Sequence, residues 1–296
     1  MNDLSKKVQE INAKEITELV HNLLLQANMY LPKDVQSLIK EAYKKEKMPL
    51  AKKALEDILK NIKLAAEKEM PLCQDCGLAV IFVEIGQDVH VINGNITDSI
   101  NEGVRQAYIE GYLRKSVDID PVINRQNTGD NTPAVIHWNM VAGNSIKIIV
   151  SPKGMGSENM SRLYMLKPAD GAEGIINSVV EAVKLAGANP CPPIVLGIGI
   201  GGNFETVALA AKRALLKEVG VRNTMPKYAE MERKIIRRVN ELGIGAGGYG
   251  GITTVLDAHI EALPTHIAGM PVAINICCHA LRHAEGVINE KQKGLK

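Results

Sequence analysis

The run PIVLGIGIGG at residues 193–202 constrains the fold more than any other segment of the chain. It is a continuous apolar stretch of strand length that ends in glycines, and residues 203–216 after it have apolar side chains at helical spacing. A buried strand that turns through glycine into a helix, with Asn203 placed to cap it, is typical of helices packed on a sheet. Residues 171–187 and the charged segment 228–242 also have helical periodicity. The sequence therefore predicts a mixed α and β fold.

The N-terminal part of the chain predicts a helical region. Residues 1–68 contain three short amphipathic patterns, and Pro32 and Pro49 lie where helix starts tolerate proline. Residues 69–296 instead have the sequence pattern of strands, glycine turns and helices. We expect this α/β region to hold the functional site. The chain has no clear linker, so we expect residues 1–296 to act as one subunit.

The segment between these regions predicts further strands. LAVIFVEIG (78–86) and DVHVING (88–94) have the β-branched, alternating pattern of strands. Asp98 is placed to cap the helix that follows. AVIHWNMVAGNSIKIIVSP (134–152) predicts a β-hairpin that turns at Gly143-Asn144.

Charge and composition exclude several classes of function. The chain has 35 Lys and Arg against 33 Asp and Glu, with both signs interleaved, so nothing indicates nucleic-acid binding. It has only two phenylalanines and one tryptophan, which argues against base-stacking surfaces. The N-terminus lacks the apolar region of a signal peptide, and no run of 18 apolar residues occurs, so we expect a cytoplasmic protein without membrane contact.

The cysteines are candidates for metal or catalytic chemistry. An odd number does not suit a disulfide framework, and cytosolic thiols stay reduced. Several lie beside residues that interrupt regular core structure, such as Gln74-Asp75 and Pro190. Spacing alone leaves open a redox dithiol or half a zinc site at the first pair, although no second C-x-x-C completes a zinc set. The five are Cys73, Cys76, Cys191, Cys277 and Cys278.

The glycines of residues 193–202 also match a dinucleotide-binding pattern. Gly197, Gly199 and Gly202 spell G-x-G-x-x-G between a strand and a helix. The second strand with its acidic ribose-binding residue is missing, so we expect these glycines to allow close packing instead.

Five segments of the sequence together resemble one enzyme family. They are PLCQDCG (71–77), NTGDNTPA (127–134), PKGMGSEN (152–159), NPCPPIVLGIGIGGNFE (189–205) and PTHIAGMPVAINICCHALRH (264–283). In this order they resemble the alpha subunit of class I iron-sulfur fumarate hydratases and L-tartrate dehydratases, from about residue 5 to residue 288.

The resemblance implies a 4Fe-4S cluster with one iron that lacks a protein ligand. The matching ligand positions are Cys73, Cys191 and Cys278. An open iron would act as a Lewis acid on the substrate hydroxyl and carboxylate. The chain departs from the family at Cys76, where threonine is usual, and at Cys277, where glutamine or another residue is common.

The resemblance also implies which residues contact a dicarboxylate substrate. Gln74 and Asp75 follow the first cluster ligand, and Gly156 and His266 match substrate-contacting positions. A dicarboxylate needs a guanidinium partner, and the family spacing favours Arg114. From the residues alone, Arg125 remains a candidate, as do the backbone amides around Gly154 with the charge of Lys153. Of these residues, we expect Gln74, Asp75 and His266 to act in catalysis.

The resemblance predicts a partner, because the family's catalytic base is a threonine of the beta subunit. We expect an alpha2-beta2 assembly that hydrates fumarate to L-malate reversibly, with L-tartrate dehydration as the alternative. Two less favoured hypotheses are a non-catalytic, oxygen-sensing iron-sulfur subunit and a nicotinamide-dependent oxidoreductase.

Overall fold

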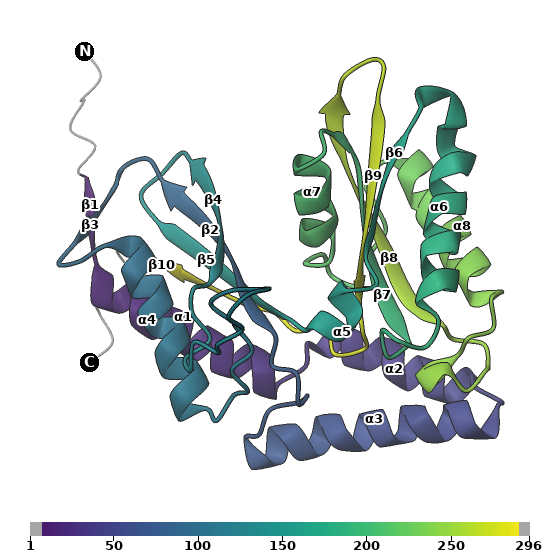
Figure 1. Ribbon diagram of the computed structural model, residues 1–296, viewed down its shortest axis with the longest axis horizontal. Helices are drawn as coiled ribbons and strands as arrows, with labels where there is room; N and C mark the ends of the chain where they lie inside the picture. The colour runs from purple at the N-terminus through teal and green to yellow at the C-terminus, as the bar shows by residue number, and fades with distance from the viewer. Residues whose placement is uncertain (1–7, 290–296) are drawn as a thin grey trace. The chain divides into compact units, whose positions relative to one another are not determined.

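The computed structural model describes residues 8–289 and divides the chain into two compact units (Figure 1). Unit 1 consists of residues up to 30, residues 65–153 and residues from 282 onward. Unit 2 consists of residues 31–64 and 154–281. The expected mixed α and β fold is confirmed. No helix among the described residues is both long and apolar enough to span a bilayer.

Unit 1 is a four-stranded sheet covered by two helices. Strand order is β10-β5-β2-β4, in which β2 is parallel to β4 and antiparallel to β5. Helices α1 and α4 cover one face through a core that includes Val20, Ile81, Val104 and Ile148. A separate pair of parallel strands joins β1 to β3. The elements of unit 1 are β1 (Gln9–Asn12), α1 (Ala13–Met29), β2 (Leu78–Gly86), β3 (Val89–Ile92), α4 (Ile96–Glu110), β4 (Val135–Val141), β5 (Ile146–Lys153) and β10 (Ala284–Ile288).

Two predictions for unit 1 are wrong. The segments β4 and β5 are strands, but they do not form a hairpin, because β2 lies between them and pairs with both. Strand β2 is almost continuously buried and takes a central position, whereas the partly exposed β4 takes the edge. Asp98 does not cap α4, because the extended residue before the helix is Asn95, whose Oδ1 accepts from the Thr97 and Asp98 amides.

Unit 2 contains a second four-stranded sheet, of order β6-β9-β7-β8. Strand β7 is central, parallel to β8 and antiparallel to β9. One face of the sheet packs on α6 and α8 through residues such as Val179, Ile198 and Ile235. Helix α7 packs directly on strand β7 of the same sheet. The elements are α2 (Lys33–Lys45), α3 (Pro49–Lys68, which ends in unit 1), α5 (Met155–Glu158), β6 (Arg162–Leu166), α6 (Gly171–Ala186), β7 (Ile194–Gly202), α7 (Thr206–Ala214), α8 (Pro226–Asn240), β8 (Val255–Thr265) and β9 (Met270–Cys277).

The glycines of β7 have the packing role that was expected of them. A Cβ on Gly197 would lie 2.1 Å from the carbonyl oxygen of Ala211, and one on Gly199 would lie 2.2 Å from that of Val207. Only glycine therefore lets α7 lie directly on β7. The helix begins at Thr206, so Asn203 is not its N-cap residue, although Asn203 Oδ1 accepts from the Thr206 amide at 2.9 Å.

The three N-terminal helices are confirmed as α1, α2 and α3, and β1 is an addition that the sequence patterns did not indicate. The structure divides the residues between two units. It remains a prediction that residues 1–296 act as one subunit, with a helical region at 1–68 and a site region at 69–296.

Candidate active site

The loop from Leu72 to Gly77 carries the first group of predicted site residues in unit 1. Cys73 and Asp75 are partly buried, and the Gln74 side chain is exposed. Buried Arg282 holds this loop, because its Nη2 donates to the Asp75 carbonyl at 2.8 Å. The loop is thus fixed by its backbone, which leaves the Gln74 side chain exposed for other contacts.

Cys76 has a structural environment that differs from that of a metal ligand. It is 1% exposed, and its Sγ accepts from the Arg114 amide at 3.2 Å. The hydroxyl of buried Tyr108 donates to the carbonyls of Cys76 (3.0 Å) and Gly77 (2.9 Å). Burial raises the pKa of the Cys76 thiol. Cys76 is therefore a neutral thiol that holds the loop in place.

The contact with Cys76 brings Arg114 to the Cys73 loop. The Arg114 side chain is exposed, and within residues 8–289 its guanidinium makes no hydrogen bond or ion pair. The other candidate, Arg125, is paired with Asp118 through Nη2 at 2.8 Å and Nε at 3.1 Å. Of the two arginines, Arg114 is the one with donors to spare for a substrate carboxylate.

The segment NTGDNTPA (127–134) helps to hold Arg114 close to the Cys73 loop. Asn131 has a φ of +65°, its Nδ2 donates to the Gly77 carbonyl, and its Oδ1 accepts from the Ser116 amide at 2.7 Å. A side chain with both a donor and an acceptor joins the Cys73 loop to the segment after Arg114.

Two cysteines of unit 2 lie at one end of its sheet. Cys191 precedes β7, is exposed, and has a φ of +55° that non-glycine residues rarely adopt. Cys278 follows β9 and is partly buried, and its neighbour Cys277 is buried and pairs with Val195 of β7. His279 Nδ1 lies 3.0 Å from the Cys191 carbonyl oxygen, which ties the two segments together.

The glycine-rich segment after α8 supports the Cys191 loop. The Gly247 amide donates to the Pro192 carbonyl at 2.8 Å, and a Cβ on Gly248 would lie 2.4 Å from that of Ala188. Buried Glu46 accepts from the Ile252 amide at 3.0 Å and so holds the other end of the segment.

Gly156 lies in α5 with open space around it. A Cβ there would meet no atom within 4 Å, and its φ is not in the left-handed region. Neither packing nor backbone conformation requires glycine at this position, and its predicted contact with a substrate stays a prediction.

The turn that contains Gly156 is anchored through Glu158. Its carboxylate accepts from Lys212 Nζ of α7 at 2.5 Å and from Asn275 Nδ2 of β9 at 2.6 Å. Asn275 Nδ2 also donates to Ser161 Oγ at 2.9 Å. The Lys212, Glu158 and Asn275 side chains form a partly buried network that fixes α5 to the sheet.

His266 lies at the other end of the same sheet. It is exposed on the turn between β8 and β9, as expected of a loop residue. Strand β7 ends where Gly202 pairs with Thr265, next to His266, whereas its first residues pair with the end of β9 at Cys277. Figure 1 shows this turn and the end of β9 at opposite ends of the strands. The structure does not bring His266 to Cys191 and Cys278.

The predicted residues therefore fall into separate groups. Unit 1 contains Cys73, Gln74, Asp75 and Arg114 around one loop, and unit 2 contains Cys191 and Cys278 at one sheet end. In residues 8–289 no three or more His, Cys, Asp or Glu side chains form a metal-binding group. Cysteine thiolates are donors that suit iron, and the role of the exposed Cys191 and half-buried Cys278 as ligands stays a prediction.

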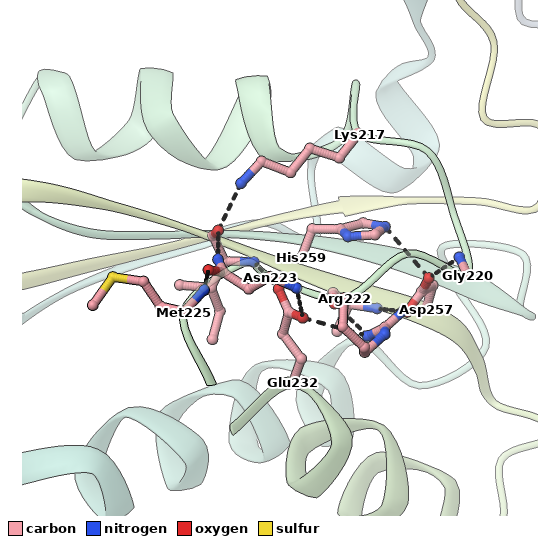
Figure 2. Close-up of polar contacts among 10 residues, drawn as sticks. Lys217, Gly220, Arg222, Asn223, Met225, Glu232, Asp257 and His259 are labelled. Carbon is pink, nitrogen blue, oxygen red and sulfur yellow. Dashed lines mark hydrogen bonds and ion pairs between the residues drawn. The ribbon is translucent and has the colours of Figure 1, made fainter. Parts of the chain in front are cut away.

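A buried polar network on β8 was not predicted (Figure 2). Asp257 accepts from the Gly220 and Ala258 amides and pairs with Arg222. Glu232 of α8 accepts from the Asn223 and Ile260 amides at 2.9 Å. Both carboxylates are at most 1% exposed. Their partners lie up to 37 residues away in the sequence, and the helical periodicity of the charged segment 228–242 did not indicate that Glu232 is buried.

The network covers the outer edge of β8, which among the described strands pairs with β7 alone. Lys217 Nζ donates to the Ile260 carbonyl at 2.7 Å, and Arg222 Nη1 donates to the Ala258 carbonyl at 3.2 Å. Side chains thus satisfy the polar groups that an edge strand leaves unpaired. Since its carboxylates are already satisfied, we assign this network to structure.

His259 is the exception within the network. It is 1% exposed, its Nε2 has no hydrogen-bond partner in the described part of the chain, and Asp257 Oδ2 lies 3.4 Å away. Burial lowers the pKa of His259 against the attraction of the Asp257 carboxylate. The imidazole borders a cavity of about 270 Å³ together with Lys217 and Arg222.

Comparison with known proteins identifies relatives over almost the whole chain. The model of the family described as "Fumarate hydratase (Fumerase)" matches residues 17–287. A Methanocaldococcus jannaschii protein, provisionally named L(+)-tartrate dehydratase subunit alpha, is 43% identical over 275 residues, which cover 91% of this chain and 96% of that protein. The L(+)-tartrate dehydratase subunit alpha of Escherichia coli O157:H7 is 32% identical over 281 residues, covering 94% and 91% respectively.

Proposed function

We propose that this chain, which belongs to the fumarate hydratase (Fumerase) family, is the alpha subunit of a hydro-lyase that hydrates fumarate to L-malate reversibly. The observation that carries the proposal is the unit 1 loop. It exposes Gln74 beside Cys73, and the Arg114 amide is bonded to the same loop, while the Arg114 guanidinium has no partner within residues 8–289. A carboxylate substrate needs this combination of amide and guanidinium donors.

The proposed cofactor is a 4Fe-4S cluster held by Cys73, Cys191 and Cys278. These are the cysteines that the structure leaves partly or fully exposed, whereas Cys76 and Cys277 are buried. When bound, the cluster supplies a Lewis-acidic iron without a protein ligand. A labile iron of this kind would make the enzyme sensitive to oxygen.

The residues of this chain bind and orient the substrate. The Arg114 guanidinium holds one carboxylate with two parallel hydrogen bonds, and the backbone near Gly156 approaches the substrate because no side chain intervenes. Gln74 and Asp75 contact the end of the substrate nearest to Cys73. Holding both ends of the dicarboxylate supplies much of the catalysis through orientation and charge stabilisation.

The proton at C3 needs a base, and no side chain of this chain is assigned that role. We propose that a beta subunit supplies it, in an alpha2-beta2 enzyme of the cytoplasm and the tricarboxylic acid cycle. The names of the relatives support a second kind of subunit, because they are called subunit alpha.

L-Tartrate is the second candidate substrate, and the names of both relatives favour it. Tartrate differs from malate by one hydroxyl, so the same carboxylate contacts serve both. The carboxylate-binding residues therefore do not distinguish the two substrates, and a direct assay has to decide.

The assay uses the chain purified anaerobically with its beta subunit. We expect conversion of L-malate to fumarate with a kcat/KM at least tenfold above that for L-tartrate dehydration, and loss of both activities in Arg114→Met. The control is Arg125→Met, which removes an arginine that already has an acidic partner. Turnover of tartrate alone would transfer the proposal to tartrate dehydration, and turnover of neither would overturn it.

A further inference from the structure

The cavity beside the outer edge of β8 has a lining that suits a polar ligand. It lies within unit 2 and has a volume of about 270 Å³, far more than the roughly 30 Å³ that one water molecule occupies in the liquid. Pockets for drug-sized molecules begin at about 300 Å³, so this cavity has room for a small molecule or ion. Apart from Val221, the described residues that line it are polar or charged. The proposed hydro-lyase reaction does not use this cavity.

The wall of the cavity is held in place without a ligand. Most of its lining belongs to the segment 217–224, which lies between α7 and α8. The Val219 amide of this segment donates to Asp34 Oδ2 of α2 at 2.9 Å, and the Gly220 amide donates to Asp257 Oδ2 of β8 at 2.5 Å. The segment is thus fixed to two elements of unit 2, and a ligand would not have to order it on binding.

His259 of β8 borders the cavity and lacks a hydrogen-bond partner. The side chain is 1% exposed, and neither ring nitrogen makes a hydrogen bond within residues 8–289. Its Nε2 lies 3.4 Å from Asp257 Oδ2, close enough for charge attraction only. Buried polar groups without a partner are rare in folded proteins, and each needs an explanation. A ligand in the cavity would supply the partner that the imidazole lacks.

Two cations that line the cavity have hydrogen-bond donors to spare. Lys217 Nζ donates to the Ile260 carbonyl at 2.7 Å, which occupies one N-H group of the ammonium. Arg222 donates to Asp257 through Nη2, and its Nε makes no hydrogen bond within the described part of the chain. In the view of Figure 2, His259 lies between these two cations. The cavity therefore has unused donors on both the segment 217–224 and β8.

The acceptors of the cavity lining are largely occupied. Glu232 Oε1 accepts from the Ile260 amide and Oε2 accepts from the Asn223 amide, both at 2.9 Å. Asn223 Oδ1 accepts from the Met225 amide at 3.0 Å. Glu218 is exposed, so water and salt screen its charge. Because donors exceed free acceptors, the matching ligand is a hydrogen-bond acceptor, and the two cations favour one with negative charge.

The charges around His259 couple such a ligand to a proton. When the imidazole is neutral, the positive charges of Lys217 and Arg222 are balanced by the carboxylates of Asp257 and Glu232. Burial lowers the pKa of His259, the two carboxylates raise it, and the two cations lower it. An anion in the cavity would add a further attraction for the protonated form, and both ring nitrogens of an imidazolium are donors. Binding of the anion and binding of the proton therefore strengthen each other.

We propose that the cavity binds a small oxyanion, which accepts hydrogen bonds from Lys217, Arg222 and a doubly protonated His259. Phosphate, sulfate and carboxylates share this chemistry. The anion supplies the missing partner of the buried imidazole, and the proton that His259 takes up from solvent offsets part of the added charge. The cavity is thus a proton-linked anion site, and the proposal is independent of the hydro-lyase function.

Titration calorimetry of the full chain with sulfate tests the proposal, because the charge of sulfate is constant near neutral pH. At constant ionic strength, we expect one site whose dissociation constant is about tenfold lower at about pH 6 than at about pH 8. Phosphate and acetate at the lower pH distinguish the two kinds of oxyanion: tighter binding of phosphate supports a tetrahedral ligand, and tighter binding of acetate supports a carboxylate. Absence of binding by all three ions, or an affinity for sulfate that does not change with pH, would overturn the proposal.

Two substitutions test whether the ion binds in this cavity. Lys217→Met is expected to raise the dissociation constant of sulfate about tenfold at both pH values, because it removes a charged donor. His259→Gln is expected to abolish the difference between the two pH values, because glutamine does not take up a proton. Lys184→Met, on the exposed surface of α6, is the matched control and should bind as wild type does.

Each substitution has an outcome that contradicts the proposal. Wild-type affinity in Lys217→Met would show that sulfate binds elsewhere, and an unchanged pH dependence in His259→Gln would show that another group takes up the proton. Circular dichroism checks that the variants are folded. If Lys217→Met does not fold, the comparison of wild type with His259→Gln still decides.

Discussion

The outer edge of β8 and the loop of Cys191 both carry polar groups in unit 2, but they differ in burial. The carboxylates at the β8 edge are buried and paired, whereas Cys191 is exposed. On β8, Asp257 and Glu232 are buried and accept hydrogen bonds from backbone amides and Arg222. Cys191 is exposed, has a left-handed backbone, and is held through its carbonyl oxygen by His279. Polar groups whose bonding capacity is filled stabilise the fold, whereas a fixed but exposed group is available to a ligand.

The largest effect on stability is expected from Arg222→Met. Arg222 is the cation that pairs with Asp257, and its removal leaves this buried carboxylate without its guanidinium partner. We expect a loss of about 3–5 kcal/mol in the free energy of unfolding, measured by urea titration. Lys234→Met is the control, because its partner Glu173 is mostly exposed and the loss should stay below about 1 kcal/mol. Equal losses would contradict the structural assignment of the network.

A smaller loss is expected from Tyr108→Phe. The buried hydroxyl shares its one proton between the carbonyls of Cys76 and Gly77. Without it the Cys76 carbonyl loses this donor, whereas the Gly77 carbonyl keeps Asn131 Nδ2. The expected cost is about 2 kcal/mol in the free energy of unfolding. Tyr30→Phe, which removes an exposed hydroxyl that donates to Glu69, should cost less than about 0.5 kcal/mol. A cost as small for Tyr108→Phe would mean that water replaces the hydroxyl.

Glu158→Gln tests whether the anchor of α5 serves the site. The substitution weakens the bond with Lys212 and places an amide donor near Asn275, so the Gly156 turn becomes mobile. We expect the KM for the dicarboxylate to rise about tenfold, or about 1.4 kcal/mol, with kcat changed less. Glu173→Gln, at the exposed ion pair with Lys234, is the control. A fall in kcat at constant KM would contradict a role in substrate binding.

The smallest effect is the pH dependence from His259. Its folded pKa lies below the ordinary value of 6.5, so unfolded chains bind the proton more readily as the pH falls. The neutral imidazole therefore contributes stability that is complete above about pH 6.5 and is lost as the pH falls through the lower folded pKa. Between pH 7.5 and 5.5, wild type should lose about 1 kcal/mol more than His259→Gln. A slope that is unchanged in His259→Gln would contradict the prediction.

The sequence predicted elements whose cause is local. The apolar periodicity of α1, α2, α3 and α6, and the continuous apolar run of β7, located these elements correctly. Strand partners depend on distant segments, so β4 and β5 were wrongly paired across a short turn that looked sufficient for a hairpin. Glu232 shows the same limit, because its partners lie on a loop and on β8.

The candidate site shows what a resemblance adds and what it omits. Family segments indicated Cys191 and Cys278, and the family spacing indicated Arg114. The structure adds that Asp118 pairs with Arg125, whereas no side chain within residues 8–289 pairs with the Arg114 guanidinium. No sequence pattern indicated that His266 lies at the opposite end of the sheet from the cysteines, since that follows from the antiparallel pairing of β7 and β9. The roles of these residues stay predictions until they are measured.

The most direct test of the central claim is the content of iron and acid-labile sulfide per alpha chain in the anaerobically reconstituted complex with the beta subunit. The account predicts about four irons in wild type and in Cys277→Ser, whose buried cysteine is not a proposed ligand, and a sharp reduction in Cys191→Ser. Full iron content in Cys191→Ser, or little iron in the wild-type complex, would contradict the claim that this exposed cysteine helps to hold a 4Fe-4S cluster.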